Sequence, residues 1–323
     1  MRRNEAAFLL AILATLSGCG GGRSGSSSPS PVVAQPTPAP TPHPVLTIIG
    51  GDTDRPVAGA RVVVAGVAST SDASGRVALN GAPAGASIDI IAEGYLDRQT
   101  QVRVGSENLA RFTLWPRRPL SRFDESYTSQ LVYTSSYIGS MGTSLPLRRL
   151  ARNITQIRIV LPPELAADPT STFFHQFAAD NMNTAVGGAF RYTVGSSPVS
   201  GSVNVAVSVD PSGTHCTSGE WIAYATVAGS PDITSITITY CALRWAQRGS
   251  VILHEMGHTL GLQHSAVRGD VMYPGGTSDV FSDRELLIMK LMYQRASGNA
   301  FPDNDRATMG LASERPDTLL CAR

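Results

Sequence analysis

Neither sign of charge dominates this sequence, and charged residues are sparse. They make up 16% of the 323 residues, and the formal net charge is +1. A chain with this balance offers no strongly basic surface, so we expect no nucleic-acid partner. A long hydrophobic run near the start is also missing. The apolar stretch from residue 6 to 16 has eleven residues, too few to span a bilayer as a stable helix.

The first residues predict export. Two arginines precede the apolar stretch, and Leu16-Ser17-Gly18-Cys19 follows it. Small residues before a cysteine resemble a bacterial lipobox, which implies that 1–18 is a signal peptide and that lipid on Cys19 anchors the chain to a bilayer. Glycine, and not aspartate, stands at position 20 after the cysteine. In this respect the chain resembles lipoproteins that Gram-negative bacteria sort to the outer membrane. An ordinary signal peptide with an incidental cysteine is the alternative.

Composition divides the next hundred residues into two parts. Residues 19–44 are rich in Gly and Ser and then in Pro and Thr, which predicts a semi-extended tether. Residues 45–116 contain short β-type runs separated by turn signals, which predict a small all-β sandwich. The run from Pro56–Ala60 through Asp72–Arg76 to Gly94–Tyr95 resembles carboxypeptidase regulatory-like domains. The expected strands are Val45–Ile49, Ala60–Val64, Gly75–Leu79, Ser87–Ile91 and Ala110–Leu114.

The remaining chain predicts an α+β domain between two less regular segments. Residues 117–153 are expected to be a linker and an irregular region with a short helix near 123–136, and 299–323 a polar C-terminal tail. Between them, 154–298 alternates strand and helix patterns. Strands are expected at Ile154–Leu161, Phe190–Val194, Val203–Val209, Trp221–Val227 and Ile233–Tyr240, and helices at 162–185, where Phe173, Phe174, Phe177 and Met182 form the apolar face, at Leu243–Leu260 and at 281–293.

The stretch from His254 to His264 reads H-E-x-x-H-x-x-G-x-x-H. On a helix, His254 and His258 lie about 40° apart on one face and can hold one ion. Gly261 can end the helix in a left-handed conformation and bring His264 in as a third ligand. Three ligands leave a zinc position open, as in catalytic sites, and Glu255 is placed to act on water. Two satisfied core histidines would explain His254 and His258 alone.

The residues that follow extend this pattern. Ser265 follows the third histidine, Met272-Tyr273-Pro274 begins eight residues after His264, and an apolar helix opens near Phe281. The combination resembles the matrixin branch of the metzincin zinc proteases. The resemblance implies a mixed twisted sheet with an active-site helix and a C-terminal helix. It also implies one catalytic zinc held by the three histidines, and a Met-turn that places Met272 beneath it.

The sequence departs from animal matrixins in three places. Their structural zinc and calcium are held in a loop rich in His and Asp, whereas 213–221 has one His and one Glu. Val267 stands where an acidic residue is expected, and no cysteine-switch motif is present. A structural calcium or a second zinc is therefore left open.

The expected function is that of a zinc-dependent endopeptidase that acts as a monomer on protein or peptide substrates. By the resemblance, Trp221–Val227 is the edge of the sheet and binds substrate as an added strand. The alternative is a surface binding or metal-binding lipoprotein without turnover. An exported location permits a disulfide between Cys216 and Cys241, which would leave Cys321 over.

Overall fold

A computed structural model describes ten stretches of the chain. They are 45–79, 82–83, 85–101, 109–117, 125–133, 145–151, 153–229, 232–275, 278–305 and 317–322. All of them belong to one compact unit, His43–Arg323. The expected signal peptide, the lipidated Cys19 and the tether lie outside the described residues.

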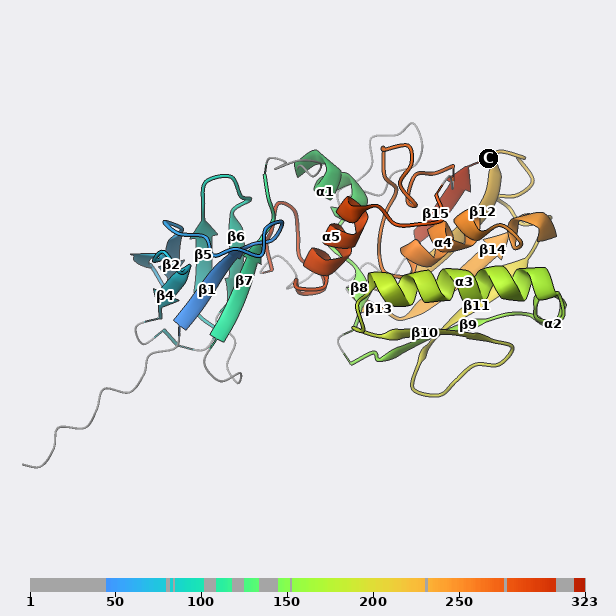
Figure 1. Cartoon of the computed structure of the whole chain (residues 1–323), viewed down its shortest axis with the longest axis horizontal. Coiled ribbons are helices and arrows are strands. Elements are labelled where there is room, and N and C mark those ends of the chain that lie inside the picture. The colour runs from blue at the N-terminus through green and yellow to red at the C-terminus, as the bar shows by residue number, and fades with distance from the viewer. Residues whose placement is uncertain are drawn as a thin grey trace, which may run out of the picture. The chain divides into compact units, whose positions relative to one another are not determined.

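Seven short strands between residues 45 and 114 form two sheets (Figure 1). One sheet has the order β4-β1-β7 and the other β3-β2-β5-β6. Alternate residues of β2 and β5 are buried, and they contribute to an apolar core separate from that of the rest of the chain. The strands are β1 (Val45–Gly50), β2 (Arg61–Val64), β3 (Val67–Thr70), β4 (Arg76–Ala78), β5 (Ser87–Ile91), β6 (Arg98–Gln101) and β7 (Leu109–Leu114).

A six-stranded sheet with the order β10-β9-β11-β14-β12-β15 forms the larger part (Figure 1). Its first four strands run parallel, while β12 is antiparallel to both of its neighbours. The small strands β8 (Arg149–Leu150) and β13 (Asp232–Ile233) pair separately. The six strands are β9 (Gln156–Val160), β10 (Arg191–Gly195), β11 (Val203–Val209), β12 (Trp221–Ala228), β14 (Ser235–Tyr240) and β15 (Asp317–Ala322).

Helices pack beside this sheet, and α3 lies against α4. None of the helices among the described residues is long and apolar enough to cross a membrane. The helices are α1 (Glu125–Tyr133), α2 (Pro163–Ala166), α3 (Pro169–Ala185), the 3-10 turn η1 (Leu243–Trp245), α4 (Gly249–His258) and α5 (Asp283–Met292).

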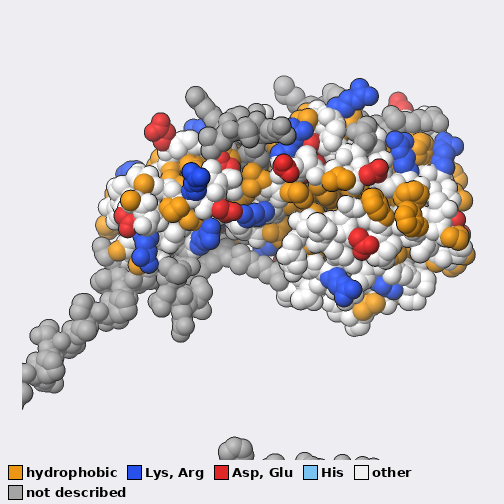
Figure 2. Space-filling model, viewed as in Figure 1, with side chains coloured by type: hydrophobic (Ala, Val, Ile, Leu, Met, Phe, Trp, Pro, Cys, Tyr) orange, Lys and Arg blue, Asp and Glu red, His pale blue; other side chains and the backbone are white. Residues whose placement is uncertain are grey.

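Two expectations about helices were wrong in detail. The active-site helix begins at Gly249 and not at Leu243, because Arg248 has an extended backbone that separates it from η1. Phe173 and Phe177 of α3 are 63% and 37% exposed, so they do not form its buried face. Small side chains, Ala178 and Ala179, take that place because they allow α3 to approach closely. Figure 2 shows apolar side chains gathered on the side of the molecule that α3 lines.

The expected polar tail contains structure. Its last described segment is β15, which pairs with β12 along its whole length. The expectation that β12 forms the edge of the sheet was therefore wrong, because its outer main-chain groups already bond to another part of the chain. Earlier in the same segment, Asn299 and Asp303 are fully buried.

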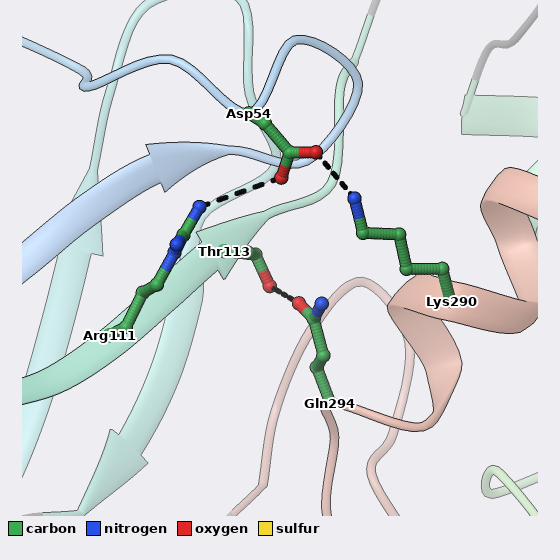
Figure 3. A pocket seen from close by; sticks show the side chains of 5 residues that line it. All are labelled: Asp54, Arg111, Thr113, Lys290 and Gln294. Atoms are coloured by element: carbon green, nitrogen blue, oxygen red, sulfur yellow. Dashed lines mark hydrogen bonds and ion pairs between the residues drawn. The ribbon is translucent and has the colours of Figure 1, made fainter. Parts of the chain in front are cut away.

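The two small sheets contact α5 through polar side chains. Arg295, just after α5, is fully buried and makes a bidentate ion pair with Asp303 at 2.9 and 3.0 Å. Its guanidinium also donates to Thr113 Oγ1 of β7 and lies over the Trp115 ring. Nearer the surface, Asp54 pairs with Lys290 and Arg111 beside a cavity of about 580 Å³ (Figure 3).

Candidate metal centre

Helix α4 and the loop after it bring three histidine rings together. One ligand nitrogen from each of His254, His258 and His264 lies within 4.8 Å of the other two. The Nε2 atoms of His254 and His258 are 3.2 Å apart. These two residues are four positions apart on α4, and this spacing places both on one face of the helix. All three are buried, at 0%, 0% and 3% exposure.

Main-chain carbonyls orient two of the rings. His254 Nδ1 lies 2.7 Å from the carbonyl oxygen of Val271, and His258 Nδ1 lies 2.8 Å from that of Leu262. A carbonyl only accepts, so each Nδ1 carries the proton and donates it. Each Nε2 is then left with its lone pair directed towards the other rings, which is the tautomer that a metal ion requires.

Gly261 turns the chain so that His264 can join the pair. Its φ is +94°, a left-handed conformation that favours glycine. A Cβ at this position would also lie 2.1 Å from the carbonyl oxygen of Arg148. Two bonds hold the turn: Gly261 donates to the carbonyl of His258, and Gln263 donates to that of Leu131 in α1. Both conformation and space therefore require glycine here.

The segment Val271–Met272 contacts His254 and packs against helix α4. Val271 bonds to His254, and the carbonyl of Met272 accepts from the N–H of Ser265 at 2.8 Å. Glu285 of α5 accepts from the N–H groups of Val271 and Met272 at 3.3 and 2.8 Å. Met272 is fully buried, and its Sδ lies 2.2 Å from the position of a Cβ on Gly257 of α4. The side chain thus packs directly beneath the helix that carries two of the histidines.

A second polar group holds the loop after His264. Asp270 is fully buried and accepts hydrogen bonds from Ser265 Oγ at 2.5 Å and Tyr127 Oη at 2.9 Å. It also pairs with Arg284 of α5 at 2.7 Å. Sequence reasoning missed Asp270, Arg284 and Tyr127, because no short-range pattern links positions so far apart. Glu285 could have been found from Ser282, which forms a capping box with it at the start of α5.

Burial decides the charge of the centre. Desolvation lowers the pKa of His254 to about 3 and that of His258 well below its usual range, so both imidazoles are neutral at neutral pH. Burial likewise raises the pKa of Glu255 well above its usual value. Neither oxygen of Glu255 has a hydrogen-bond partner among the residues that the structure describes. Three converging imidazole nitrogens, with a buried carboxyl group on the same helix, fit a zinc ion, because its charge would offset the cost of ionising Glu255.

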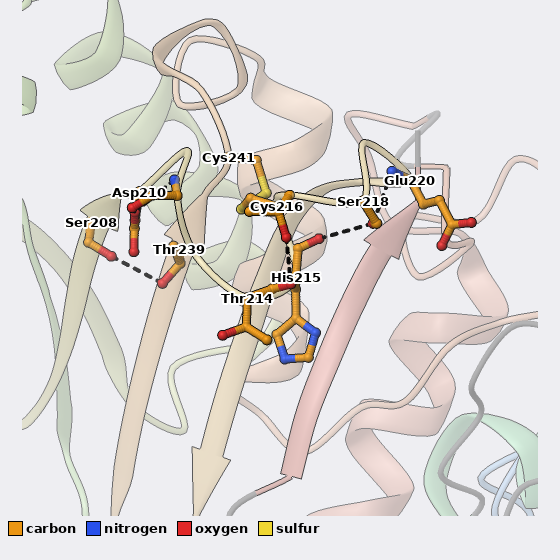
Figure 4. The surroundings of a disulfide bond; sticks show 11 residues. Ser208, Asp210, Thr214, His215, Cys216, Ser218, Glu220, Thr239 and Cys241 are labelled. Carbon is orange, nitrogen blue, oxygen red and sulfur yellow. Dashed lines mark hydrogen bonds between the residues drawn. A yellow bond between two sulfur atoms is a disulfide. The ribbon is translucent and has the colours of Figure 1, made fainter.

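The disulfide lies at the end of the sheet near α4. Cys216, in the loop before β12, is bonded to Cys241 at the end of β14, with 5.2 Å between their Cα atoms (Figure 4). The N–H of Cys241 also donates to the carbonyl of Ile222 in β12. His215, beside the disulfide, lies with its ring against Tyr224 and apart from the other histidines. His175 of α3 is fully buried and bonds to Ser171 and Tyr240, a structural arrangement.

Comparison with known protein families identifies the same segment. The family described as Matrixin matches residues 233–286, which include the three histidines, Glu255 and Met272. This match and the histidine group support a matrixin-like metallopeptidase. No curated protein matches the chain.

Two solved structures show weaker similarity. Metalloproteinase-II from Bacteroides fragilis is 10% identical with a TM-score of 0.30, over 76% of this chain and 84% of that one. CpGH84D is 7% identical with a TM-score of 0.20, over 34% of this chain. The chain spans only 17% of the length of CpGH84D. At these TM-scores, neither similarity bears on function.

Proposed function

We propose that this protein is a zinc-dependent endopeptidase that hydrolyses peptide bonds in extended protein segments. The observation that carries the proposal is the convergence of three buried imidazoles on the helix and loop that also carry Glu255, a buried carboxyl group without a partner among the described residues. His254, His258 and His264 would hold one zinc ion. Zinc, when bound, polarises the scissile carbonyl and makes a water molecule more acidic.

Glu255 is the proposed general base. It directly follows His254 on α4 and is fully buried. It would take the proton of the attacking water and return it to the amine that leaves. Met272 would shape the floor of the site without acting as a ligand.

Internal cleavage follows from the charges near the site. An exopeptidase needs a fixed charge to hold a terminal carboxylate or amine, and residues 251–265 include no Lys or Arg. We therefore propose a preference for segments within a chain. Peptides blocked at both ends should be cut at rates similar to those of their unblocked twins, as read by mass spectrometry of the products. Stepwise loss of single residues, abolished by blocking, would count against an endopeptidase.

The proposal also covers the anchor and the small sheets. Cys19 would be lipidated and would hold the monomeric enzyme at the bacterial outer membrane, with the segment 19–44 as tether. The two sheets between 45 and 116 would form a carboxypeptidase regulatory-like sandwich that acts as a spacer. Fractionation of cells that make Cys19→Ala tests the anchor: a variant that stays as membrane-bound as the parent rules it out.

A protease gel with and without a chelator tests the central proposal. We expect cleared zones that a chelator removes and that added zinc restores. Metal analysis of the same sample distinguishes the proposed enzyme from the alternative, a non-catalytic metal-binding lipoprotein. A protein that binds one zinc per chain but clears no substrate would support that alternative and overturn the enzyme.

A further inference from the structure

The outer side of β12 is already occupied. The strand β15 pairs with it antiparallel, from Val227 opposite Asp317 to Trp221 opposite Ala322, with an irregularity between Trp221 and Ala223. On its other side, β12 pairs antiparallel with β14. Without β15, it would present a row of free main-chain N–H and C=O groups at the edge of the sheet. Such an edge is where an extended peptide adds to a sheet.

This edge is next to the metal centre. Helix α4, which carries His254, Glu255 and His258, contacts both β12 and β15. The same three residues are fully buried. A scissile carbonyl must approach the reacting groups closely, and a substrate paired with β12 would lie beside the helix that carries them.

We propose that β15 occupies the substrate-binding edge of β12 and holds the enzyme in a latent form until an extended substrate, or release of the strand, replaces it. This inference rests on the proposed function. An antiparallel substrate strand would need the main-chain groups of β12 that β15 now uses, and two strands cannot share one edge. The protein therefore carries its own competitor for the site.

The connection of β15 to the rest of the chain makes it an effective competitor. Residues 306–316 join it to the described residue Asp305. A strand tethered by a short segment acts at an effective concentration on the order of millimolar. A free peptide with equal intrinsic affinity would have to reach that concentration to displace it. Substrate at micromolar concentration then cannot displace β15 from β12. Removal of β15 therefore lowers the KM for substrate.

The sharpest test changes the main chain of β15 in the full protein. Successive N–H groups in a strand point to opposite sides, so the double variant Leu319→Pro/Leu320→Pro must remove one donor that faces β12. The matched control is Leu319→Ala/Leu320→Ala, which shortens the same side chains and keeps both donors. Bound zinc and the Cys216–Cys241 disulfide are checked first, to show that the fold is intact.

We expect the proline variant to exceed both the parent and the alanine control in kcat/KM by about tenfold or more on a short peptide. The gain should lie mainly in KM. A synthetic peptide with the sequence of residues 317–322 should then inhibit the proline variant competitively. Equal kcat/KM in all three proteins, all folded and active, would overturn the proposal.

A second variant tests the proposal without proline, in case the proline substitutions disturb folding. Thr226 and Thr318 are direct partners across the two strands, so Thr226→Cys/Thr318→Cys can lock β15 in place. The locked protein should be at least about tenfold less active than the parent and should recover on reduction. The parent treated with the same reductant is the control, because it also carries Cys216–Cys241. Undiminished activity of the locked protein contradicts the proposal.

Failure of the proposed function would look different. If no variant hydrolyses peptide although each holds zinc, the endopeptidase is wrong, and strand displacement can still be measured. A fluorescent peptide of residues 317–322 should bind the proline variant and not the locked one. Equal binding to both would overturn the displacement as well.

Discussion

Two buried polar clusters in this protein differ in whether their polar groups are paired with each other. The cluster around Arg295 pairs its charges internally, since the guanidinium meets both oxygens of Asp303 and both side chains are fully buried. The cluster around His254 and His258 has neutral rings and, in Glu255, a carboxyl group without a partner among the described residues. The charges of the first cluster are paired with each other, whereas the second cluster presents nitrogen donors that a cation can bind.

This difference distinguishes buried polar groups that stabilise the fold from buried polar groups that can bind a ligand. A buried ion pair that satisfies itself gives no site for a ligand, and loss of one member leaves the other charge unpaired. Nitrogen donors that converge on one point instead form a site that a cation can bind. The two clusters should therefore respond to mutation in opposite ways, one in stability and the other in turnover.

The largest effect is expected at Glu255. The variant Glu255→Gln should keep about one zinc per chain and lose about 10²- to 10⁴-fold in kcat, because the general base is removed and the ligands stay. Its free energy of unfolding should stay close to that of the parent, since Glu255 makes no hydrogen bond to the described residues. Turnover at the parental rate would remove Glu255 from the mechanism.

Glu285 provides the matched control for this variant. It is also a buried glutamate, but its carboxylate accepts from Met272 and Ser282 at 2.8 Å. In Glu285→Gln an amide group replaces one acceptor, so we expect a loss of about 1–3 kcal/mol in the free energy of unfolding. Zinc affinity should also fall by about 10- to 100-fold, because Val271 orients His254. Equal stability of the two variants would contradict the contrast.

The next largest effect is expected in the closed cluster. Arg295→Met leaves Asp303 buried without its partner and should cost about 3–5 kcal/mol of stability, measured by urea unfolding. The control is Lys290→Met, which removes an exposed ion pair with Asp54 and should cost less than about 1 kcal/mol (Figure 3). A similar cost for both would mean that burial does not decide the contribution of these pairs.

The parts of the fold that could be predicted from the sequence are those with local signals. The histidine spacing, Gly261 and the alternating pattern of β11 are each contained in a few consecutive residues. The limits of β11 agree with the expectation, Val203–Val209. The turn after α4 could also be predicted, because the conformation of a single residue, Gly261, requires glycine there.

The parts that could not be predicted depend on distant partners. β6 has the sequence Arg-Gln-Thr-Gln and carries no apolar alternation, because its buried Arg98 bonds to Asp305 and to the carbonyl of Thr113. β15 was expected to be part of a polar tail, because no local pattern reveals its pairing with β12, whose residues lie 90 to 101 positions earlier in the chain. The ion pair of Arg295 with Asp303 has no motif.

The last expected effect concerns His175, a buried histidine outside both clusters. Its Nδ1 donates to the carbonyl of Ser171, and the Tyr240 hydroxyl donates to its Nε2, so both ring nitrogens have partners. Desolvation lowers its pKa from 6.5 to about 4. The unfolded chain therefore takes up this proton first as the pH falls. The stability from neutral His175 is complete above pH 6.5 and is lost progressively towards pH 4, by about 3 kcal/mol at most. Urea unfolding of the metal-free protein at a series of pH values measures this loss, with His175→Gln as the reference that keeps the other titrations. The loss between pH 6.5 and 4 should be smaller in the variant. An equal loss in both proteins would show that His175 does not contribute to it.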